Sequence, residues 1–178
     1  MNRLQTITES EATGKTAQLF SVIKRSMGKV PNAYLTIGTQ SPEILEQMLQ
    51  LNATLHKGSL SARELEAINL AVSEESGCDY CLAAHTLMAK KAGYTDDQTR
   101  ELREARFSSD ARIDALVQFV QYLVSTRGTV AADRVHTFRE AGFSDQQVVD
   151  TIGAVSAILF TNMVNRVNDT VIDFPKVS

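Results

Sequence analysis

The stretch Gly77-Cys78-Asp79-Tyr80-Cys81-Leu82-Ala83-Ala84-His85 holds both cysteines of this chain, with two residues between them, and a histidine follows the second cysteine by four positions. The helical pattern before it ends at Ser76-Gly77, and a mostly apolar run from Tyr80 to Ala89 predicts that another helix begins here. The cysteines then lie near the first turn, where unpaired backbone N–H groups and the helix dipole favour a thiolate. Residues four apart share a helix face, so we expect His85 beside Cys81 rather than Cys78. This stretch therefore predicts a dithiol redox centre.

A cysteine pair followed by a histidine has three chemical interpretations. In a redox site one cysteine attacks an oxidised substrate, and the other resolves the product as a disulfide. In a zinc site both thiolates and His85 are ligands, with Glu66 or water as the fourth. In the third, both cysteines are small buried hydrophobes. We favour the redox site and expect no metal, because a structural zinc site needs a second pair of soft ligands and the chain has no other cysteine.

Glu66 supports the redox interpretation. It lies twelve residues before Cys78, on a mostly apolar helix that must turn back against the cysteine helix. A carboxylate is costly to bury there unless it has a partner. Near His85 it would hold the imidazole in the tautomer that accepts a thiol proton, whereas the alternative is a glutamate that faces solvent. The other histidines, His56 and His136, are expected at the surface or at helix ends.

Almost every segment of the chain repeats with helical period, and no convincing alternating strand is present. We therefore expect an all-α fold, a single-domain helical bundle over residues 1–178. Capping signals support several boundaries, among them Ser61 with Glu64 as a capping box. The expected helices are 9–26, 33–37, one that starts at Ser41-Pro42, 62–76, the cysteine helix to 91, one capped by Thr95 to 105, one capped by Ser108-Ser109-Asp110 to 127, 131–141, and a longest one that starts at Ser144.

One short pattern occurs twice, as Ala92–Gln98 and as Ala141–Gln147. Each is a junction of helix, glycine, aromatic residue, cap and helix. Either the two halves of the chain are related helical hairpins, or any good helix–turn–helix junction converges on this chemistry. Residues 60–105 form the expected core motif, and residues 168–178 an extended C-terminal arm. Phe119 and Tyr122 lie off the main apolar face of their helix, which fits either a partner surface or packing within the chain.

The composition excludes several classes of protein. The 178 residues are 43% hydrophobic and 22% charged, without tryptophan, as in a globular domain with an aliphatic core. A net charge of -3 and scattered Lys and Arg indicate no nucleic-acid partner. The polar N-terminus lacks a signal-peptide core, and no run reaches the roughly 18 apolar residues of a membrane span. We therefore expect a cytoplasmic protein without a membrane partner, in which a close cysteine pair is catalytic, redox-active or metal-binding.

The motif Glu66, Cys78-x-x-Cys81-x-x-x-His85 resembles the signature of the alkylhydroperoxidase D-like branch of the carboxymuconolactone decarboxylase superfamily. The region from Leu65 to Leu87 and the Ala92-Gly93-Tyr94 junction also fit. Two further segments are similar to the longer peroxidase-related members of this superfamily: Gly28–Asn32 and Asp173–Pro175. The resemblance covers most of the chain, and the cysteine motif is its specific part.

The resemblance implies an all-helical fold that assembles as a homo-oligomer, commonly a trimer, hexamer or dimer. It implies that Cys81 attacks a hydroperoxide and becomes a sulfenic acid, that Cys78 closes the disulfide, and that Glu66 and His85 relay protons. The redox-active disulfide is then the only cofactor. A thiol or a lipoylated carrier protein would reduce it again.

This chain departs from the family prototype directly before the second cysteine, where Tyr80 replaces a histidine. Asp79 also brings a negative charge close to the sulfurs, which opposes thiolate formation. We expect a shorter proton relay and weaker activity toward peroxides. The predicted function is an antioxidant thiol peroxidase or dithiol oxidoreductase with peroxiredoxin activity. The alternatives are a decarboxylase of the same fold, which does not rely on a cysteine pair, and a redox-sensing or binding oligomer without turnover.

Overall fold

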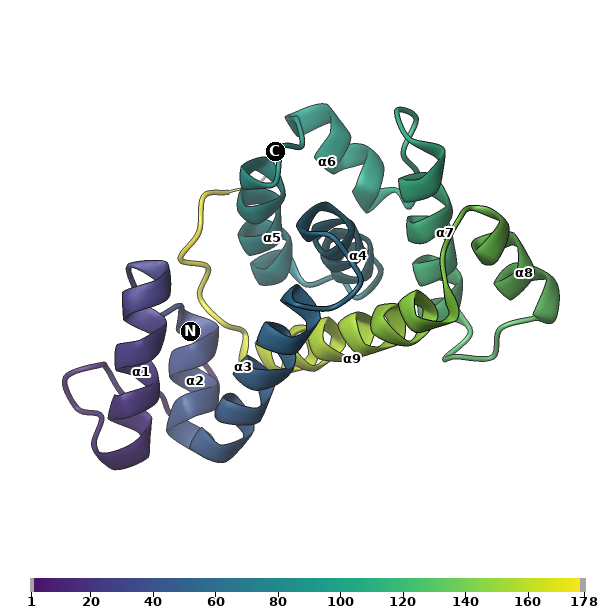
Figure 1. The fold of residues 1–178 in the computed structure, drawn as a ribbon. Coiled ribbons are helices and arrows are strands. Elements are labelled where there is room, and N and C mark those ends of the chain that lie inside the picture. Colours follow the sequence, from purple (N-terminus) through teal and green to yellow (C-terminus); the bar gives the residue numbers. More distant parts are fainter. Residues whose placement is uncertain (1, 177–178) are drawn as a thin grey trace.

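The fold is all-α, as the sequence predicts, and residues 2–176 are described by a computed structural model (Figure 1). Every regular element in this range is a helix, and the helices form one domain. Their bounds are α1 Gly14–Met27, α2 Asn32–Gln40, α3 Pro42–His56, α4 Ala62–Glu75, α5 Asp79–Lys91, α6 Asp96–Arg103, α7 Ala111–Ser125, α8 Ala132–Glu140 and α9 Asp145–Asn168.

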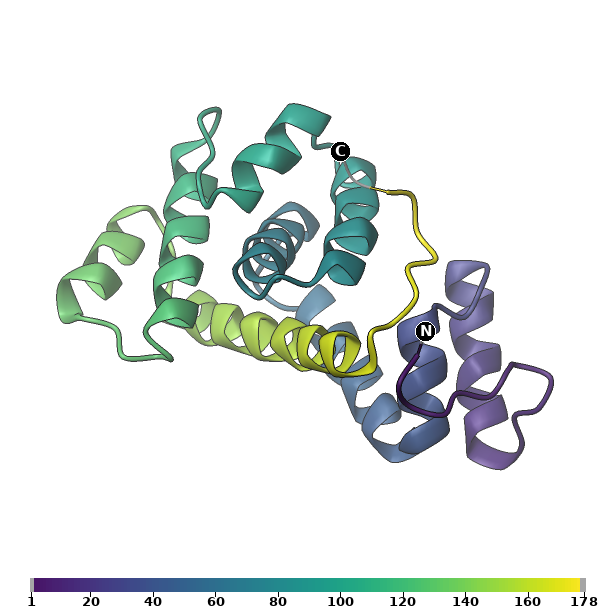
Figure 2. The same ribbon diagram turned by 180° about the vertical axis from the view of Figure 1, so that it is seen from behind.

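Helix α4 is the centre of the larger part of the molecule and packs against α5, α6, α7 and α9 (Figures 1 and 2). The predicted capping box is present at its start, because Ser61 and Glu64 exchange hydrogen bonds. Its side chains are apolar around most of the helix, and Ala67, Ile68 and Leu70 are completely buried. A helix that is apolar on nearly every side is stable only when neighbours surround it.

Helices α1, α2 and α3 form a smaller lobe with its own apolar cluster, to which Phe20, Ile37 and Leu45 belong. Gly38 permits this packing. A Cβ atom at that position would lie 2.5 Å from the Phe20 ring and 2.8 Å from Leu45, so only glycine lets α2 approach so closely. The lobe is therefore a compact unit that can serve as one wall of a site between itself and the rest of the domain.

The two copies of the repeated sequence pattern adopt the same local structure. In each, a glycine has a left-handed φ of +95° or +90°, a buried aromatic ring lies under an arginine guanidinium, and a capping box starts the next helix. The matching pairs are Gly93 and Gly142, Tyr94 and Phe143, Arg63 and Arg112, and Thr95 and Ser144. The junction is thus a structural repeat, while the relation between whole hairpins stays a prediction.

One helix start expected from the sequence is wrong. Helix α1 starts at Gly14 rather than at residue 9, because Glu11 folds back to accept hydrogen bonds from the backbone and side chain of Thr8 and ends that segment in a turn. Of the two roles expected for Phe119 and Tyr122, the structure shows packing within the chain. Phe119 is buried and stacks on Phe138 of α8, with ring centroids 4.3 Å apart. The Tyr122 ring lies under the guanidinium of Arg134, which also belongs to α8.

Helix α9 spans 24 residues and, within residues 2–176, is long and apolar enough to cross a membrane by length and composition. The same test is passed by the core helices of globular folds. One side of α9 packs against α4, α3 and α5, where polar Thr151, Asn162 and Asn165 are buried. The opposite side exposes an uncharged row of apolar residues: Val149, Ile152, Met163 and Val167.

The C-terminal arm is extended, as predicted, and runs from the end of α9 past α5 (Figure 1). Asp173 holds it in place, because its carboxylate accepts a hydrogen bond from the Tyr80 hydroxyl at 2.8 Å and pairs with Lys29 at 2.7 Å. Phe174 packs edge-on against the Tyr80 ring, with centroids 5.6 Å apart. The arm is thereby fastened to the first turn of the cysteine helix. Its last two predicted residues, 177–178, lie outside the described range.

Candidate redox site

The first turn of α5 places both sulfur atoms at a helix N-terminus, as the sequence predicts. Gly77 adopts a left-handed φ of +61°, which turns the chain sharply between α4 and α5. Cys78 is the N-cap residue, and its Sγ accepts a hydrogen bond from the backbone N–H of Cys81 at 3.4 Å. This sulfur therefore occupies the position where helix ends bind negative charge.

The two cysteines are free thiols, and their sulfur atoms are hydrogen-bonded to each other at 2.7 Å. Both residues are buried, with exposed fractions of 1% for Cys78 and 3% for Cys81. Since the sulfurs already touch, a disulfide between them needs only a small rearrangement of the helix start. Their arrangement fits dithiol chemistry, in which the pair closes and opens reversibly.

The acidity of the pair lies on Cys78. Its hydrogen bonds from the Cys81 thiol and backbone N–H lower its pKa to about 7, against the effect of burial. The same hydrogen bond, together with burial, raises the pKa of Cys81. Sequence reasoning placed both cysteines at the thiolate-favouring helix end and the base beside Cys81. The structure separates these properties, because the N-cap position and the lowered pKa belong to Cys78.

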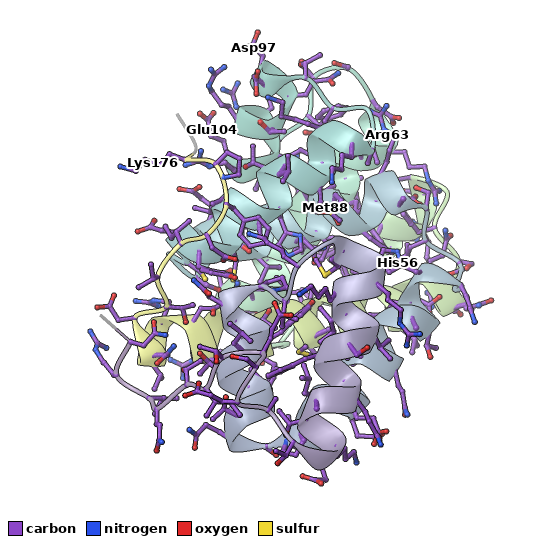
Figure 3. The ribbon with its side chains drawn as sticks, turned by 90° about the vertical axis from the view of Figure 1, so that its left-hand side faces the viewer. His56, Arg63, Met88, Asp97, Glu104 and Lys176 are labelled. Atoms are coloured by element: carbon purple, nitrogen blue, oxygen red, sulfur yellow. The ribbon has the colours of Figure 1, made fainter. Side chains whose placement is uncertain are left out.

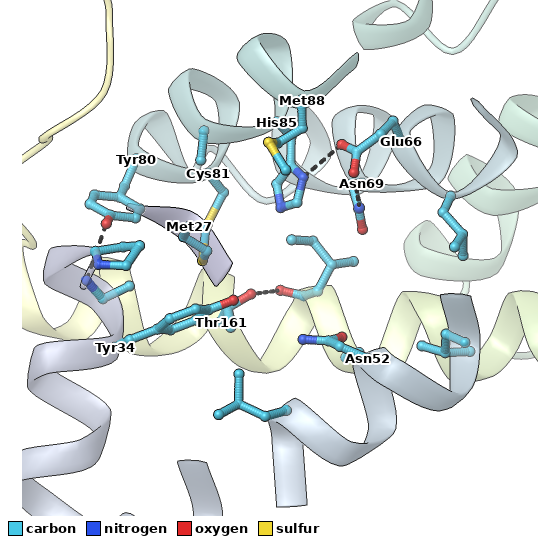
Figure 4. Close-up of a pocket in the computed structure, with 18 of the residues that line it drawn as sticks. Met27, Tyr34, Asn52, Glu66, Asn69, Tyr80, Cys81, His85, Met88 and Thr161 are labelled. Atoms are coloured by element: carbon cyan, nitrogen blue, oxygen red, sulfur yellow. Dashed lines mark hydrogen bonds and ion pairs between the residues drawn. The ribbon is translucent and has the colours of Figure 1, made fainter. Parts of the chain in front are cut away.

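Glu66 and His85 form the pair that the spacing predicts. The Glu66 carboxylate contacts Nδ1 of His85 at 2.8 Å, and the Glu66 side chain is only 9% exposed. Glu66 is thus buried and paired, which excludes the solvent-facing alternative. A carboxylate accepts a hydrogen bond here, so the ring proton belongs on Nδ1 and Nε2 is left as an acceptor. His85 and Cys81 both point from α5 into the same cavity (Figure 4).

A cavity of about 290 Å³ lies between the α1–α3 lobe and the rest of the domain. Cys81 lines it, whereas Cys78 lies behind Cys81, away from the cavity wall. The walls are mostly apolar, and they come from α1, α2, α3, α4, α5, α9 and the C-terminal arm. Apolar lining residues include Ile23, Leu49, Leu55, Leu65, Ile158 and Phe174. A substrate would therefore meet Cys81 and His85 within a largely apolar enclosure.

His56 lies at the end of α3, exposed as expected, and it also lines the cavity together with Met88. Figure 3 labels these two residues on the same face of the molecule. His136 is exposed on α8, pairs with Glu140 at 3.3 Å and takes no part in the cavity wall. Of the two histidines outside the motif, only His56 therefore lies at the cavity.

Two asparagines of α9 complete the surroundings of the sulfurs, and sequence reasoning missed both roles. Asn165 donates a hydrogen bond from Nδ2 to Sγ of Cys81 at 3.3 Å. Asn162 donates to Ser73 at 3.2 Å, and its side chain also helps to lower the pKa of Cys78. The sequence showed Asn162 only as an interruption in an apolar run. Two amides three positions apart on a buried helix face were the available signal.

Tyr80 makes its hydrogen bonds to α2 and to the C-terminal arm. Its hydroxyl accepts a hydrogen bond from the backbone N–H of Ala33 at 3.1 Å and donates to Asp173, and burial raises its pKa. The residue that replaces the prototype's histidine is thus committed to the arm. Asp79 is exposed, so that water screens its charge from the sulfurs. Weaker peroxide activity stays a prediction.

Within residues 2–176 no group of three or more His, Cys, Asp and Glu side chains is arranged to hold a metal ion. In particular, Glu66 uses one oxygen for Nδ1 of His85, and the Cys78 sulfur is turned toward Cys81. This arrangement gives the zinc interpretation no support. That the site works without a metal stays a prediction.

Residues 42–123 match the model of the Carboxymuconolactone decarboxylase family. Glu66, Cys78, Cys81 and His85 all fall inside the matched segment. Residues 42–123 form a carboxymuconolactone decarboxylase family domain. The cavity, however, extends beyond this family domain, since α1, α2, α9 and the C-terminal arm supply part of its walls.

Two relatives have similar sequences. The chain is 26% identical over 96 residues to the alkyl hydroperoxide reductase Rv2159c of Mycobacterium tuberculosis, which covers 54% of this chain. The chain spans only 28% of that relative's length. It is also 26% identical over 131 residues to the uncharacterized protein YdfG of Bacillus subtilis, which covers 72% of this chain and 86% of YdfG.

Solved structures show that the fold extends over nearly the whole chain. The alkylhydroperoxidase AhpD core of a peroxidase-related protein from Ralstonia eutropha has a TM-score of 0.86 at 19% identity, covering 97% of this chain and 92% of that one. The debrominase Bmp8 in complex with 2,3,4-tribromopyrrole has a TM-score of 0.81 at 16% identity, covering 97% of this chain and 92% of that one. A peroxidase-related protein from Silicibacter has a TM-score of 0.78 at 18% identity, covering 96% of this chain and 94% of that one. These likenesses establish the fold alone.

Proposed function

We propose that this protein is an antioxidant thiol peroxidase that reduces organic hydroperoxides through a cycle between Cys78 and Cys81. One observation carries the proposal: two free thiols in contact at 2.7 Å, of which the cavity-lining one shares a helix face with a histidine held by a buried carboxylate. The family domain and the alkyl hydroperoxide reductase relative support this reaction class.

In the first half of the reaction, Nε2 of His85 accepts the proton of the Cys81 thiol, while Glu66 holds Nδ1. The Cys81 thiolate attacks the terminal oxygen of the hydroperoxide, the O–O bond breaks, and the alkoxide leaves and takes up a proton. Cys81 is then a sulfenic acid. Asn165, which already donates to the Cys81 sulfur, stabilises the negative charge while it is there.

In the second half, the Cys78 thiolate attacks the Cys81 sulfur, and hydroxide leaves as water after it takes up a proton. The lowered pKa of Cys78 suits this resolving role, because about half of that thiol is ionised near pH 7. The balance is one hydroperoxide and two thiols consumed, and one alcohol, one water and one disulfide formed.

A dithiol must then reduce the disulfide, and the shape of the site favours a slender one. Both cysteines are buried, and Cys81 is reached through the cavity. A lipoyl group on a carrier protein, or a small thiol, can enter where a protein surface cannot. Cycling thiols also require a reducing compartment, which agrees with a cytoplasmic location.

We also propose self-association, and the exposed row on α9 is the surface that fits a second copy. The row carries no charge over most of the helix length, and its spacing resembles the seam of a helix pair. Exposed apolar side chains near both ends of one helix face, with no charged residue between them, favour contact with a partner chain. Trimer, hexamer and dimer are all compatible with it.

Reductive dehalogenation is a second candidate, which the apolar cavity beside the dithiol favours. In that reaction the two thiols supply two electrons to a carbon–halogen bond, a proton replaces the halogen, and halide and disulfide are products. The debrominase Bmp8 shares this fold. Release of bromide from a small brominated pyrrole by the reduced protein would support this candidate over peroxide reduction.

The test is a free-thiol count on the reduced protein before and after one equivalent of cumene hydroperoxide, followed by turnover with dihydrolipoamide. We expect two thiols lost per chain, recovery on addition of the dithiol, and no turnover in Cys81→Ser. Reversible thiol loss without turnover would instead identify a redox sensor. An unchanged thiol count would refute the peroxidase and leave the decarboxylase and dehalogenase alternatives.

A further inference from the structure

The chemistry at Cys81 leaves one requirement unmet by the motif residues. Sulfur attacks a peroxide in line with the O–O bond, so the leaving oxygen lies on the far side of the attacked oxygen. A proton donor for this oxygen must therefore stand across the cavity from Cys81. His85 lies one turn along the same helix as Cys81 and has taken the thiol proton, so it belongs to the near wall.

Tyr34 stands on the facing wall. It belongs to α2, it lines the same cavity, and its ring packs against both apolar clusters of the molecule. Figure 4 shows it across the cavity from His85 and Glu66. Burial raises its pKa, and the negative charges of Cys81 and Glu66 raise it further. The phenol is thus protonated at neutral pH and lies close enough to feel the charge of the reacting sulfur.

The hydroxyl of Tyr34 makes no hydrogen bond to any residue in the described range 2–176. Tyr34 is half-buried and lines the cavity, so its hydroxyl, which has no protein partner among these residues, is available to a ligand there. Other hydroxyls around the cavity are already committed. Thr161 donates to the carbonyl of Ile158, and Tyr80 donates to Asp173.

We propose that Tyr34 is a further catalytic residue, whose hydroxyl donates a proton to the leaving oxygen of the bound hydroperoxide. It has this role only if the site reduces hydroperoxides, the function proposed above. The new S–O bond forms as the O–O electron pair departs with the alkoxide, which takes the phenol proton and leaves as an alcohol. An alkoxide is a stronger base than a phenolate, so this transfer is favourable. The proton held on His85 then returns to the phenolate through the cavity.

Asn52 is the main rival on the facing side, since it also lines the cavity from α3. Its amide can donate a hydrogen bond to the leaving oxygen but does not give up a proton. The two residues therefore predict different sensitivity to the basicity of the leaving group. Loss of a proton donor lowers the reaction rate most when the leaving group is a basic alkoxide. Loss of an amide that only positions the substrate lowers the rate with all oxidants alike.

The test compares Tyr34→Phe with the wild type and with Tyr122→Phe, a matched change outside the cavity. Tyr34→Phe keeps the ring and removes no internal hydrogen bond, so the melting temperature should not change. Each reduced protein is mixed with tert-butyl hydroperoxide or with peracetic acid, and the rate of thiol loss is followed in a single turnover. Iodoacetamide alkylation is the control, because the iodide that leaves needs no proton.

We expect Tyr34→Phe to slow the reaction with tert-butyl hydroperoxide about 100-fold, as for loss of a general acid. With peracetic acid, whose leaving carboxylate is a weak base, the loss should shrink to within about threefold, and alkylation should match the wild type. Equal losses with both oxidants, or none with either, would overturn the role of Tyr34 alone. A wild type that reacts with neither oxidant would overturn the proposed function and this role together.

Discussion

Replacing Cys78 with serine should abolish a pH dependence of stability that the thiol pair imposes on this protein. The native pKa of Cys78 is about 7, lowered from an ordinary value of 9.0, while that of Cys81 is raised. Between the native pKa of Cys78, about 7, and the ordinary thiol pKa of 9.0, the unfolded chain holds one more thiol proton than the native protein. Cys81 stays protonated in the native protein throughout this window. Stability therefore rises with pH through this window and is lost as the pH falls through about 7.

The size of the effect follows from the shift. A pKa lowered by two units contributes about 2.7 kcal/mol to the free energy of unfolding. Near pH 9 the two thiols of the unfolded chain also ionise in part, which reduces this contribution to about 2 kcal/mol. Cys78 is only 1% exposed, so solvent screening takes little from this figure. Well above pH 9 stability falls as the pH rises, because Cys81 in the native protein keeps a proton that the unfolded chain has lost.

The assay is urea unfolding under reducing conditions at about pH 6 and about pH 8.5, on the wild type and on Cys78→Ser. We expect the wild type to gain about 1.5–2 kcal/mol relative to the variant between these pH values, since other titrating groups are common to both. Thiolate absorbance, measured in parallel, should rise with a midpoint near pH 7 in the wild type alone. Identical pH dependence in both proteins would refute the assignment of the thiolate to Cys78.

Three other changes test the surrounding structure. Glu66→Gln should lower peroxide turnover about 10- to 100-fold, because an amide no longer fixes the His85 tautomer, whereas Glu74→Gln at the exposed end of the same helix should not; equal activity of both would contradict the pairing. Asp173→Ala should free the C-terminal arm and speed amide exchange in residues 169–176, and unchanged exchange would show that the arm is held otherwise. Met163→Glu should reduce the mass measured by light scattering if copies associate through α9, and an unaltered mass would place the interface elsewhere.

Local patterns were sufficient for most helix starts and for the motif, but not for the start of α1. The capping box at Ser61 and the repeated glycine–aromatic–cap junctions set helix starts through contacts within a few residues, and the sequence shows such contacts directly. Spacing likewise predicted that Glu66 would meet His85, because α4 and α5 are consecutive antiparallel helices with a short turn between them.

What the sequence determined by itself was the set of helices and the presence of a dithiol motif with its carboxylate and imidazole, all within about twenty residues of one another. Only the tertiary structure decided which sulfur carries the low pKa and which one faces the cavity. It also placed Asn165 and Tyr34 at the site from α9 and α2. The reason is physical: these relations depend on how distant helices pack, and side chains from more than 40 positions away leave no local periodicity to read.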